Sequence, residues 1–253
     1  MRPAYAFFLT AAAAITGACQ TATPVATASA TLPVATSTVP LPTATATSTP
    51  SPTVPPATPT IAPPQPVLKY LTGVQVISLD TMDDPGKWEL YAGTIADGVL
   101  EVRGNNDWNG LIRKGSTLEG TGVITSFKYT PNPEFEIFFD HGDWDTDPYR
   151  RFGVYVLSYP RTNLWQGRNL WWKTLQGNFQ PKPDTWYSIL MAIGKDGEFL
   201  AIIWDPSDPS KTIAYHEEVG RDWAGLTWTF KIGANVGTAQ FDDFMRISFD
   251  DIK

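Results

Sequence analysis

Short stretches of the chain between residues 74 and 252 alternate apolar with polar residues. This period of two is typical of β-strands that bury one face and expose the other. It appears in 74–79, 98–102, 123–129 and 135–139, and further short strands are predicted at 152–157, 187–193, 199–204, 227–234 and 244–252. Turn signals rich in Gly, Pro, Asn and Asp separate them, and no convincing amphipathic helix is present. The pattern therefore predicts an all-β fold, a two-sheet antiparallel β-sandwich (jelly roll).

Two of the predicted strands, 187–193 and 199–204, are apolar on both faces. The segment Gly194-Lys195-Asp196-Gly197 between them is typical of a hairpin turn. One face of this hairpin belongs in the core. We expect the other face to be covered by further segments or to lie in a groove.

The N-terminus has the pattern of an export signal. Met1-Arg2 gives a positive start, and the apolar run Ala4–Ile15 is too short to span a bilayer. The residues Thr16-Gly17-Ala18-Cys19 resemble a bacterial lipobox, although Thr16 stands where an aliphatic residue is usual. The resemblance implies a signal peptide over 1–18 and a lipidated Cys19 at the mature N-terminus. The alternative is an ordinary secretory signal with an incidental cysteine.

Residues 20–66 contain no charged and no aromatic side chain, only Thr, Pro, Ala, Ser, Val and a few others. Such a composition buries too little apolar surface to offset the entropy of folding. Its prolines favour extended polyproline II, so the segment reaches on the order of 100 Å. The prediction is a disordered linker at 19–66, tethered through Cys19, and a globular domain at 67–253 on the extracytoplasmic side of the cell membrane.

The charge balance of the domain limits the classes of partner that it can bind. After removal of the signal peptide it carries 18 basic and 26 acidic side chains. A net charge of about −8 argues against nucleic acid and against direct contact with anionic lipid, so we expect membrane attachment only through the lipid. The single cysteine excludes an intrachain disulfide, and no Gly-x-Ser-x-Gly motif supports a serine hydrolase. We expect a monomer.

The closing segment Phe241–Ile252 is an acidic, alternating strand at the C-terminus. Together with Ala96–Val102, Asp184–Tyr187 and Lys195–Gly197 it resembles concanavalin A-like lectin/glucanase domains, including their laminin-G-like and 3-keto-disaccharide-hydrolase-like members. The resemblance implies that the last strand pairs with the first.

Laminarinase-type glucanases of this fold carry three acids at alternate positions on one strand. The candidates here are Glu134 and Glu136, which point to the same face roughly 7 Å apart, and Asp140 further along that face. Phe138 stands at the third position and breaks the pattern. The alternative is that these acids are only the solvent-side residues of an alternating strand.

Aromatic residues in turn-rich sequence indicate a sugar site. Sugars pair an apolar C–H face with a ring of hydroxyls, so their sites combine aromatic rings with amide and charged groups. The candidates are Trp108, Asn109, Trp144, Trp165, Arg168 and Trp171. Trp171 and Trp172 are adjacent, so on a strand only one of them lines a groove. The tryptophans assigned to the core are Trp88, Trp186, Trp204 and Trp228.

Three aspartates, Asp143, Asp145 and Asp147, alternate as oxygen ligands in calcium loops often do. The glycine and distal glutamate of an EF-hand are absent, and acidic loops also occur without a metal. A structural Ca²⁺ at this loop is the single cofactor that the sequence suggests.

These observations predict a lipid-anchored, non-catalytic carbohydrate-binding module. The alternative is a glycoside hydrolase of the same fold that uses Glu134, Glu136 or Asp140. A second alternative is an adhesion or scaffolding module that binds a protein partner. The polysaccharide-binding and enzymatic readings share one fold and differ in whether the bound glycan is cleaved.

The lipid anchor is tested by Cys19→Ser. Loss of the acylated thiol removes the chains that hold the protein to the membrane. The variant should appear as soluble protein or as uncleaved precursor. Membrane fractionation and mass spectrometry of the N-terminal peptide measure this outcome. Unchanged fractionation and no lipid mass on the wild-type peptide would contradict the prediction.

Overall fold

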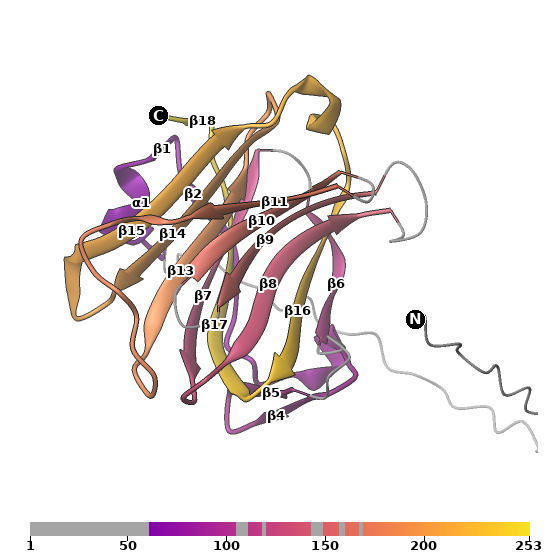
Figure 1. Ribbon diagram of the computed structural model, residues 1–253, viewed down its shortest axis with the longest axis vertical. Helices are drawn as coiled ribbons and strands as arrows, with labels where there is room; N and C mark the ends of the chain where they lie inside the picture. Colours follow the sequence, from indigo (N-terminus) through magenta and orange to yellow (C-terminus); the bar gives the residue numbers. More distant parts are fainter. Residues whose placement is uncertain (1–60, 105–110, 118–119, 143–148, 157–159, 167–168) are drawn as a thin grey trace, which may run out of the picture. The chain divides into compact units, whose positions relative to one another are not determined.

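The computed structural model describes residues 61–253 apart from 105–110, 118–119, 143–148, 157–159 and 167–168, and without the side chains of 111–117 and Trp165. The described chain is almost wholly β (Figure 1). Besides two single-turn 3-10 helices it has one short helix, α1 (Gln65–Leu68). None of the described helices has the length and apolar character to cross a membrane.

The strands form two large antiparallel sheets and one small one. The seven-stranded sheet has the order β11-β10-β9-β8-β16-β6-β3, and the larger sheet follows β12-β15-β14-β13-β7-β17-β5-β4 with β2 beside β17. The strand bounds are β1 (Leu71–Thr72), β2 (Gln75–Asp80), β3 (Trp88–Leu90), β4 (Gly93–Ala96), β5 (Val99–Arg103), β6 (Leu111–Thr117), β7 (Thr121–Tyr129), β8 (Glu134–His141), β9 (Arg150–Val156), β10 (Pro160–Gln166), β11 (Asn169–Thr174), β12 (Gln176–Gly177), β13 (Tyr187–Ile193), β14 (Glu198–Asp205), β15 (Asp208–Glu218), β16 (Trp228–Val236), β17 (Thr238–Ser248) and β18 (Asp251–Ile252). The predicted antiparallel sandwich is confirmed.

The main core lies between the two large sheets and is rich in aromatic rings. Phe135 of β8 meets Phe127 of β7 and Phe241 of β17 at centroid distances of 6.0 and 5.9 Å. Phe152 of β9 packs on Phe199 of β14 at 4.5 Å. These contacts cross from one sheet to the other, so the alternating pattern of each strand is satisfied by burial against the facing sheet.

The hairpin of β13 and β14 is buried on both faces, as its sequence predicts. One face joins the main core, while Leu190, Leu200 and Trp204 on the other face belong to a second apolar cluster. Val67 of α1 and Ile252 of β18 belong to this cluster too. The two ends of the domain therefore cover the hairpin.

The pairing of the first and last strands is confirmed. β17 runs antiparallel to β2, with Phe244 opposite Asp80, and β18 pairs with β1, with Ile252 opposite Leu71. Both ends of the domain are thereby hydrogen-bonded into sheets.

Two details differ from the sequence analysis. The segment 161–172, interpreted as turn-rich, forms most of β10 and β11 at the edge of the seven-stranded sheet. Trp186, assigned to the core, is only partly buried and lies before β13 with Lys128 Nζ 5.0 Å from its ring centroid. The other three tryptophans assigned to the core are buried: Trp88, Trp204 and Trp228.

Core and surface tryptophans should respond differently to truncation. Trp228 is fully buried between Trp223 and Phe199, whereas Trp172 is 41% exposed. Trp228→Ala should lower the free energy of unfolding by about 3–5 kcal/mol, because it leaves a large cavity. Trp172→Ala, the matched control, should lower it far less, as measured by urea denaturation. Equal losses for the two variants would contradict this arrangement of the core.

Candidate active site

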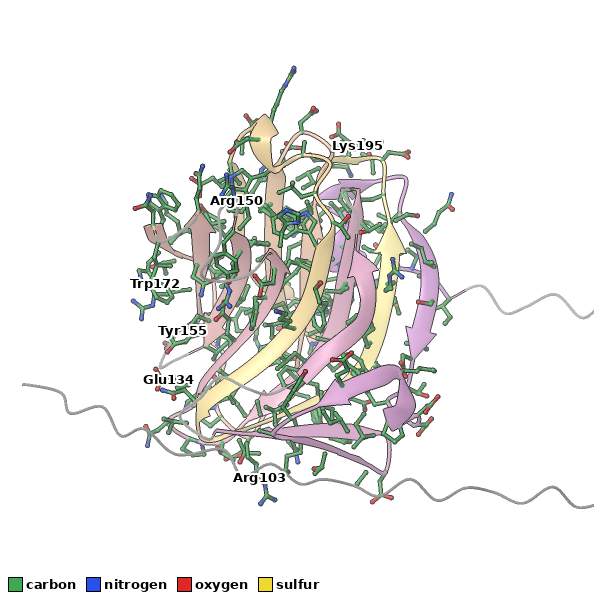
Figure 2. The ribbon with its side chains drawn as sticks, turned by 90° about the vertical axis from the view of Figure 1, so that its right-hand side faces the viewer. Arg103, Glu134, Arg150, Tyr155, Trp172 and Lys195 are labelled. Atoms are coloured by element: carbon green, nitrogen blue, oxygen red, sulfur yellow. The ribbon has the colours of Figure 1, made fainter. Side chains whose placement is uncertain are left out.

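Three acidic residues share the outer face of the seven-stranded sheet. They are Glu134, Glu136 and Asp140 of β8, which lies between β9 and β16 in the middle of the sheet. On β9, Tyr155 is opposite Glu136 and Arg151 is opposite Asp140. Figure 2 shows Glu134 and Tyr155 close together along one margin of the domain. We call these three acids and their charged partners the acid cluster.

Glu136 is buried, with only 3% of its surface exposed. Its Oε2 accepts a hydrogen bond from Arg151 Nη1 at 3.2 Å. Its side chain crosses Gly153, where a Cβ atom would come within 2.2 Å of Glu136 Oε1 and 2.5 Å of Asn163 Oδ1. Burial raises the pKa of Glu136 above its ordinary value of 4.5, and this outweighs Arg151 and Asn163, which favour the charged form. Position 153 requires glycine, because a Cβ atom there would clash with the Glu136 carboxyl group.

Asp140 is also buried and is held by two cations. Lys231 Nζ of β16 donates to its Oδ2 at 2.8 Å, and Arg151 Nη2 lies 3.8 Å from the same oxygen. The Arg151 guanidinium stacks 4.0 Å from the ring centroid of Phe138, and Tyr149 lies 5.6 Å away. Burial of two of the three acids contradicts the interpretation of these residues as the solvent side of a strand.

Glu134 has a different environment from the two buried acids. It is partly exposed, its Oε1 accepts a hydrogen bond from the Tyr155 hydroxyl, and its Oε2 accepts one from Asn235 Nδ2 at 2.8 Å. Burial and the neighbouring Glu134 both raise the pKa of Tyr155, which keeps the phenol protonated as a donor. Among the described residues, two neutral donors and no cation therefore hold Glu134.

An aromatic surface lies beside the acid cluster. Trp172 of β11 contacts Tyr155 edge to face at 5.3 Å, and the Arg161 guanidinium lies 4.9 Å from its ring centroid. Trp172 is opposite Asn163, while Trp171 is opposite the core residue Leu164. The structure therefore places Trp172, rather than the sequence candidate Trp171, on the face that carries the acids.

Most other sequence candidates lie outside the described residues. These are Trp108, Asn109, Trp144 and Arg168 of the sugar site and Asp143, Asp145 and Asp147 of the calcium loop. Trp165 lies in β10, but its side chain is not described. Within the described residues no group of three His, Cys, Asp or Glu side chains is placed to hold a metal. The calcium site remains a prediction.

The sequence analysis missed the partners of the acids. Arg151, Tyr155 and Asn163 come from β9 and β10, and Lys231 and Asn235 from β16. Alternation places Arg151, Gly153 and Tyr155 on one face of their strand, which is a usable signal. The pairing of that face with Glu136 depends on strand register, which the sequence pattern does not supply.

Comparisons with known proteins identify the fold. No family model matches the chain, and no curated protein matches it in sequence. Among solved structures the chain resembles concanavalin A-like jelly-roll enzymes. The likeness covers most of the domain at identities near one residue in ten.

Three of these structures have a TM-score of 0.50. One comes from work on endo-acting O-glycanases with which human gut microbiota initiate mucin breakdown; it is 10% identical and covers 70% of this chain and 100% of its own. The second is SCLam, a non-specific endo-β-1,3(4)-glucanase from family GH16, 8% identical over 76% of this chain and 94% of its own. The third is the catalytic domain of an endo-1,3-β-glucanase (laminarinase) from Thermotoga petrophila RKU-1, 9% identical over 72% and 100%.

These comparisons correct the main functional prediction. The sequence analysis favoured a non-catalytic carbohydrate-binding module and leaned against an enzyme. The similar structures are glycoside hydrolases, so the reading as a non-catalytic module is overturned. The prediction of a concanavalin A-like jelly roll is confirmed.

The raised pKa of Glu136 predicts how the stability of the fold depends on pH. Its native pKa lies above the unfolded value, so the native state binds more protons and stability falls as pH rises from about 4.5 through the raised pKa. Glu136→Gln removes this contribution. We compare the melting temperatures of wild type and Glu136→Gln by calorimetry. The difference, wild type minus variant, should therefore decrease from pH 4 to pH 8. A difference that increases with pH would show that Arg151 lowers the pKa instead.

Proposed function

We propose that the protein is a glycoside hydrolase that cleaves a polysaccharide at the acid cluster. The observation that carries the proposal is the unequal environment of Glu134 and Glu136, two carboxyl groups on one face of one strand. Glycosidases use such a pair, one as an acid and the other as a nucleophile or base. Two carboxyl groups whose environments differ in this way are typical of acid/base pairs.

Glu136 is the acid in this proposal. Its burial favours the protonated form, as a residue that protonates the leaving oxygen requires. Phe138, at the third position of the glucanase pattern, has no proton to give. Asp140 is bound to Lys231 and Arg151, so its role is to hold Arg151 in place.

Glu134 is the nucleophile or base. Its hydrogen bonds from Tyr155 and Asn235 orient a carboxylate that is more exposed than Glu136. It acts on the anomeric carbon, directly or through a water molecule, and the configuration of the first product distinguishes the two routes.

The neighbouring aromatic surface supports a sugar as the substrate. Trp172 is 41% exposed beside Tyr155, and its ring offers an apolar face to sugar C–H groups. The Arg161 guanidinium beside Trp172 supplies hydrogen-bond donors on the same sheet face.

The location of the enzyme is part of the proposal. A lipidated Cys19 and the linker 19–66 hold a monomeric domain at the outer side of the cell membrane, where it meets extracellular polysaccharide. The calcium loop at Asp143, Asp145 and Asp147 would add a structural ion.

The activity is tested with the full-length protein on laminarin, mixed-linkage β-glucan and mucin O-glycans, by release of reducing ends. Glu136→Gln and Glu134→Gln should each reduce kcat on the order of 10²–10⁴-fold, because each removes a group that transfers a proton or attacks in the transition state.

The matched control is Glu89→Gln, an exposed acid on β3, which should keep full activity. Circular dichroism should show that all three variants keep the β-fold. Binding of these glycans by wild type with no reducing ends released, or full activity in both cluster variants, would contradict the proposal.

A further inference from the structure

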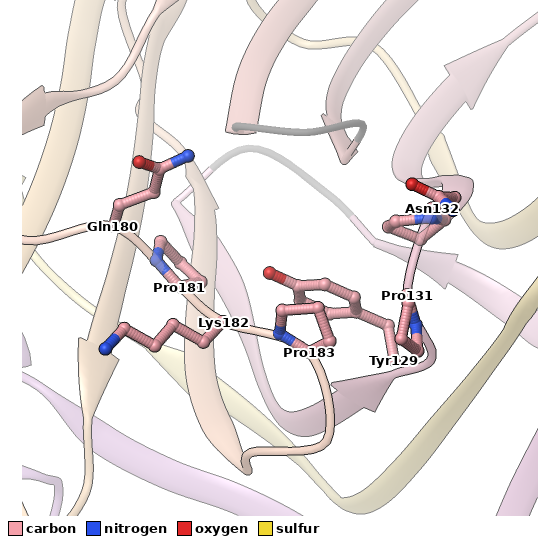
Figure 3. A pocket seen from close by; sticks show the side chains of 8 residues that line it. Tyr129, Pro131, Asn132, Gln180, Pro181, Lys182 and Pro183 are labelled. Carbon is pink, nitrogen blue, oxygen red and sulfur yellow. The ribbon is translucent and has the colours of Figure 1, made fainter.

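A pocket of about 430 Å³ lies beyond the acid cluster, at one end of the sandwich. The turn between β7 and β8 forms one wall, and the loop 180–183 before β13 forms the other (Figure 3). Both walls carry prolines: Pro131 and Pro133 in the turn, Pro181 and Pro183 in the loop.

Both walls are anchored to the sheets by hydrogen bonds. The amide of Lys182 donates to the Tyr187 hydroxyl at 3.0 Å, and the amide of Asp184 donates to the carbonyl oxygen of Tyr129 at 2.8 Å. On the turn side, the amide of Thr130 donates to the carbonyl of Thr238 at 3.0 Å. The pocket is therefore preformed, which limits the entropy lost when a ligand binds.

Tyr129 places a polar group between the two walls. Its side chain is only 4% exposed, yet no hydrogen bond joins its hydroxyl to any of the described residues. Figure 3 shows the hydroxyl end of the ring directed toward the loop. Burial raises the pKa of Tyr129 to about 12, so the phenol stays protonated and can donate. The hydroxyl is open to the pocket rather than sealed in the core, so a ligand hydroxyl can pair with it.

The lining matches the chemistry of a sugar ring. Proline rings offer apolar C–H surfaces, and Asn132, Gln180 and Lys182 add donors and acceptors around them. None of the described residues that line this pocket is a carboxylate. The neighbouring hollow of about 300 Å³ is a weaker candidate, because Glu101 there is already paired with Arg103 at 2.7 Å.

We infer that this pocket is a distal subsite that binds one sugar residue of the polysaccharide cleaved at the acid cluster. Pro133 lines the pocket and the next residue, Glu134, begins β8, so the pocket adjoins the strand that carries the acids. The identity of the ligand rests on the proposed function, while the pocket and its unpartnered hydroxyl do not.

The test measures binding of a ladder of β-1,3-gluco-oligosaccharides and of mucin O-glycans by calorimetry, with the full-length Glu136→Gln protein to prevent turnover. Tyr129→Phe removes only the hydroxyl and should weaken binding of the longer oligosaccharides roughly three- to tenfold, the worth of one hydrogen bond. Binding of disaccharides at the acid cluster should not change.

Asn132→Gly is a second pocket variant. Asn132 has a φ of 56°, which glycine accepts without strain, so the substitution removes the side chain and keeps the turn. It should show the same dependence on chain length. The control is Tyr91→Phe, which loses an exposed hydroxyl bound to Glu89 and should bind every length as before.

The outcomes separate the two proposals. Weaker binding of long oligosaccharides in the pocket variants supports the subsite, even if wild type hydrolyses nothing and the proposed function fails. Hydrolysis by wild type with unchanged long-chain binding and KM in both pocket variants would overturn the subsite and leave the proposed function standing. Failure of every probe to bind would overturn the subsite as well.

Discussion

The Arg151 guanidinium lies between two buried carboxyl groups, and the arrangement of the whole outer face follows from that position. Its Nη1 is 3.2 Å from Glu136 and its Nη2 is 3.8 Å from Asp140. Buried charges of one sign are strongly destabilising unless opposite charges accompany them. Arg151 supplies one such charge to both acids, and Lys231 supplies a second to Asp140 at 2.8 Å. Truncating the guanidinium would leave Glu136 without its cation in a buried site.

Burial and the strands beside β8 make its two glutamates unequal. Glu136 folds inward across Gly153, where the absence of a Cβ atom leaves room for its carboxyl group. Glu134, two residues earlier on the same face, is bound by the neutral donors Tyr155 and Asn235. A strand with period two would otherwise present its acids in equivalent surroundings. The difference comes from the strands on either side of β8, and it is the property on which acid/base chemistry at this face depends.

The sequence predicts the features that depend on a single strand and misses those that depend on the neighbouring strands. Alternation along one strand predicted β7 and β8 and placed the three acids on one face, because that information is local. Burial of Glu136 was missed because it depends on Arg151 and Gly153 of another strand. Trp171 was chosen over Trp172 for the same reason: alternation says that one of them faces the acids, and only the register with Asn163 says which. β10 and β11 were read as turns because their polar, Asn- and Gln-containing sequence carries a weak strand pattern.

The β7–β8 turn connects the cluster with the end of the sandwich. Its residues 131–133 wall the pocket beside Tyr129, and the chain then enters β8 at Glu134. Backbone hydrogen bonds at Thr130 and Asp184 fix this turn and the facing loop to the sheets. An extended polymer gains affinity from a second contact only if the separation between contacts is fixed, since a mobile loop would lose in ordering entropy what the contact contributes. Pro133 directly precedes Glu134, so the covalent chain fixes this wall of the pocket relative to the strand that carries the acids.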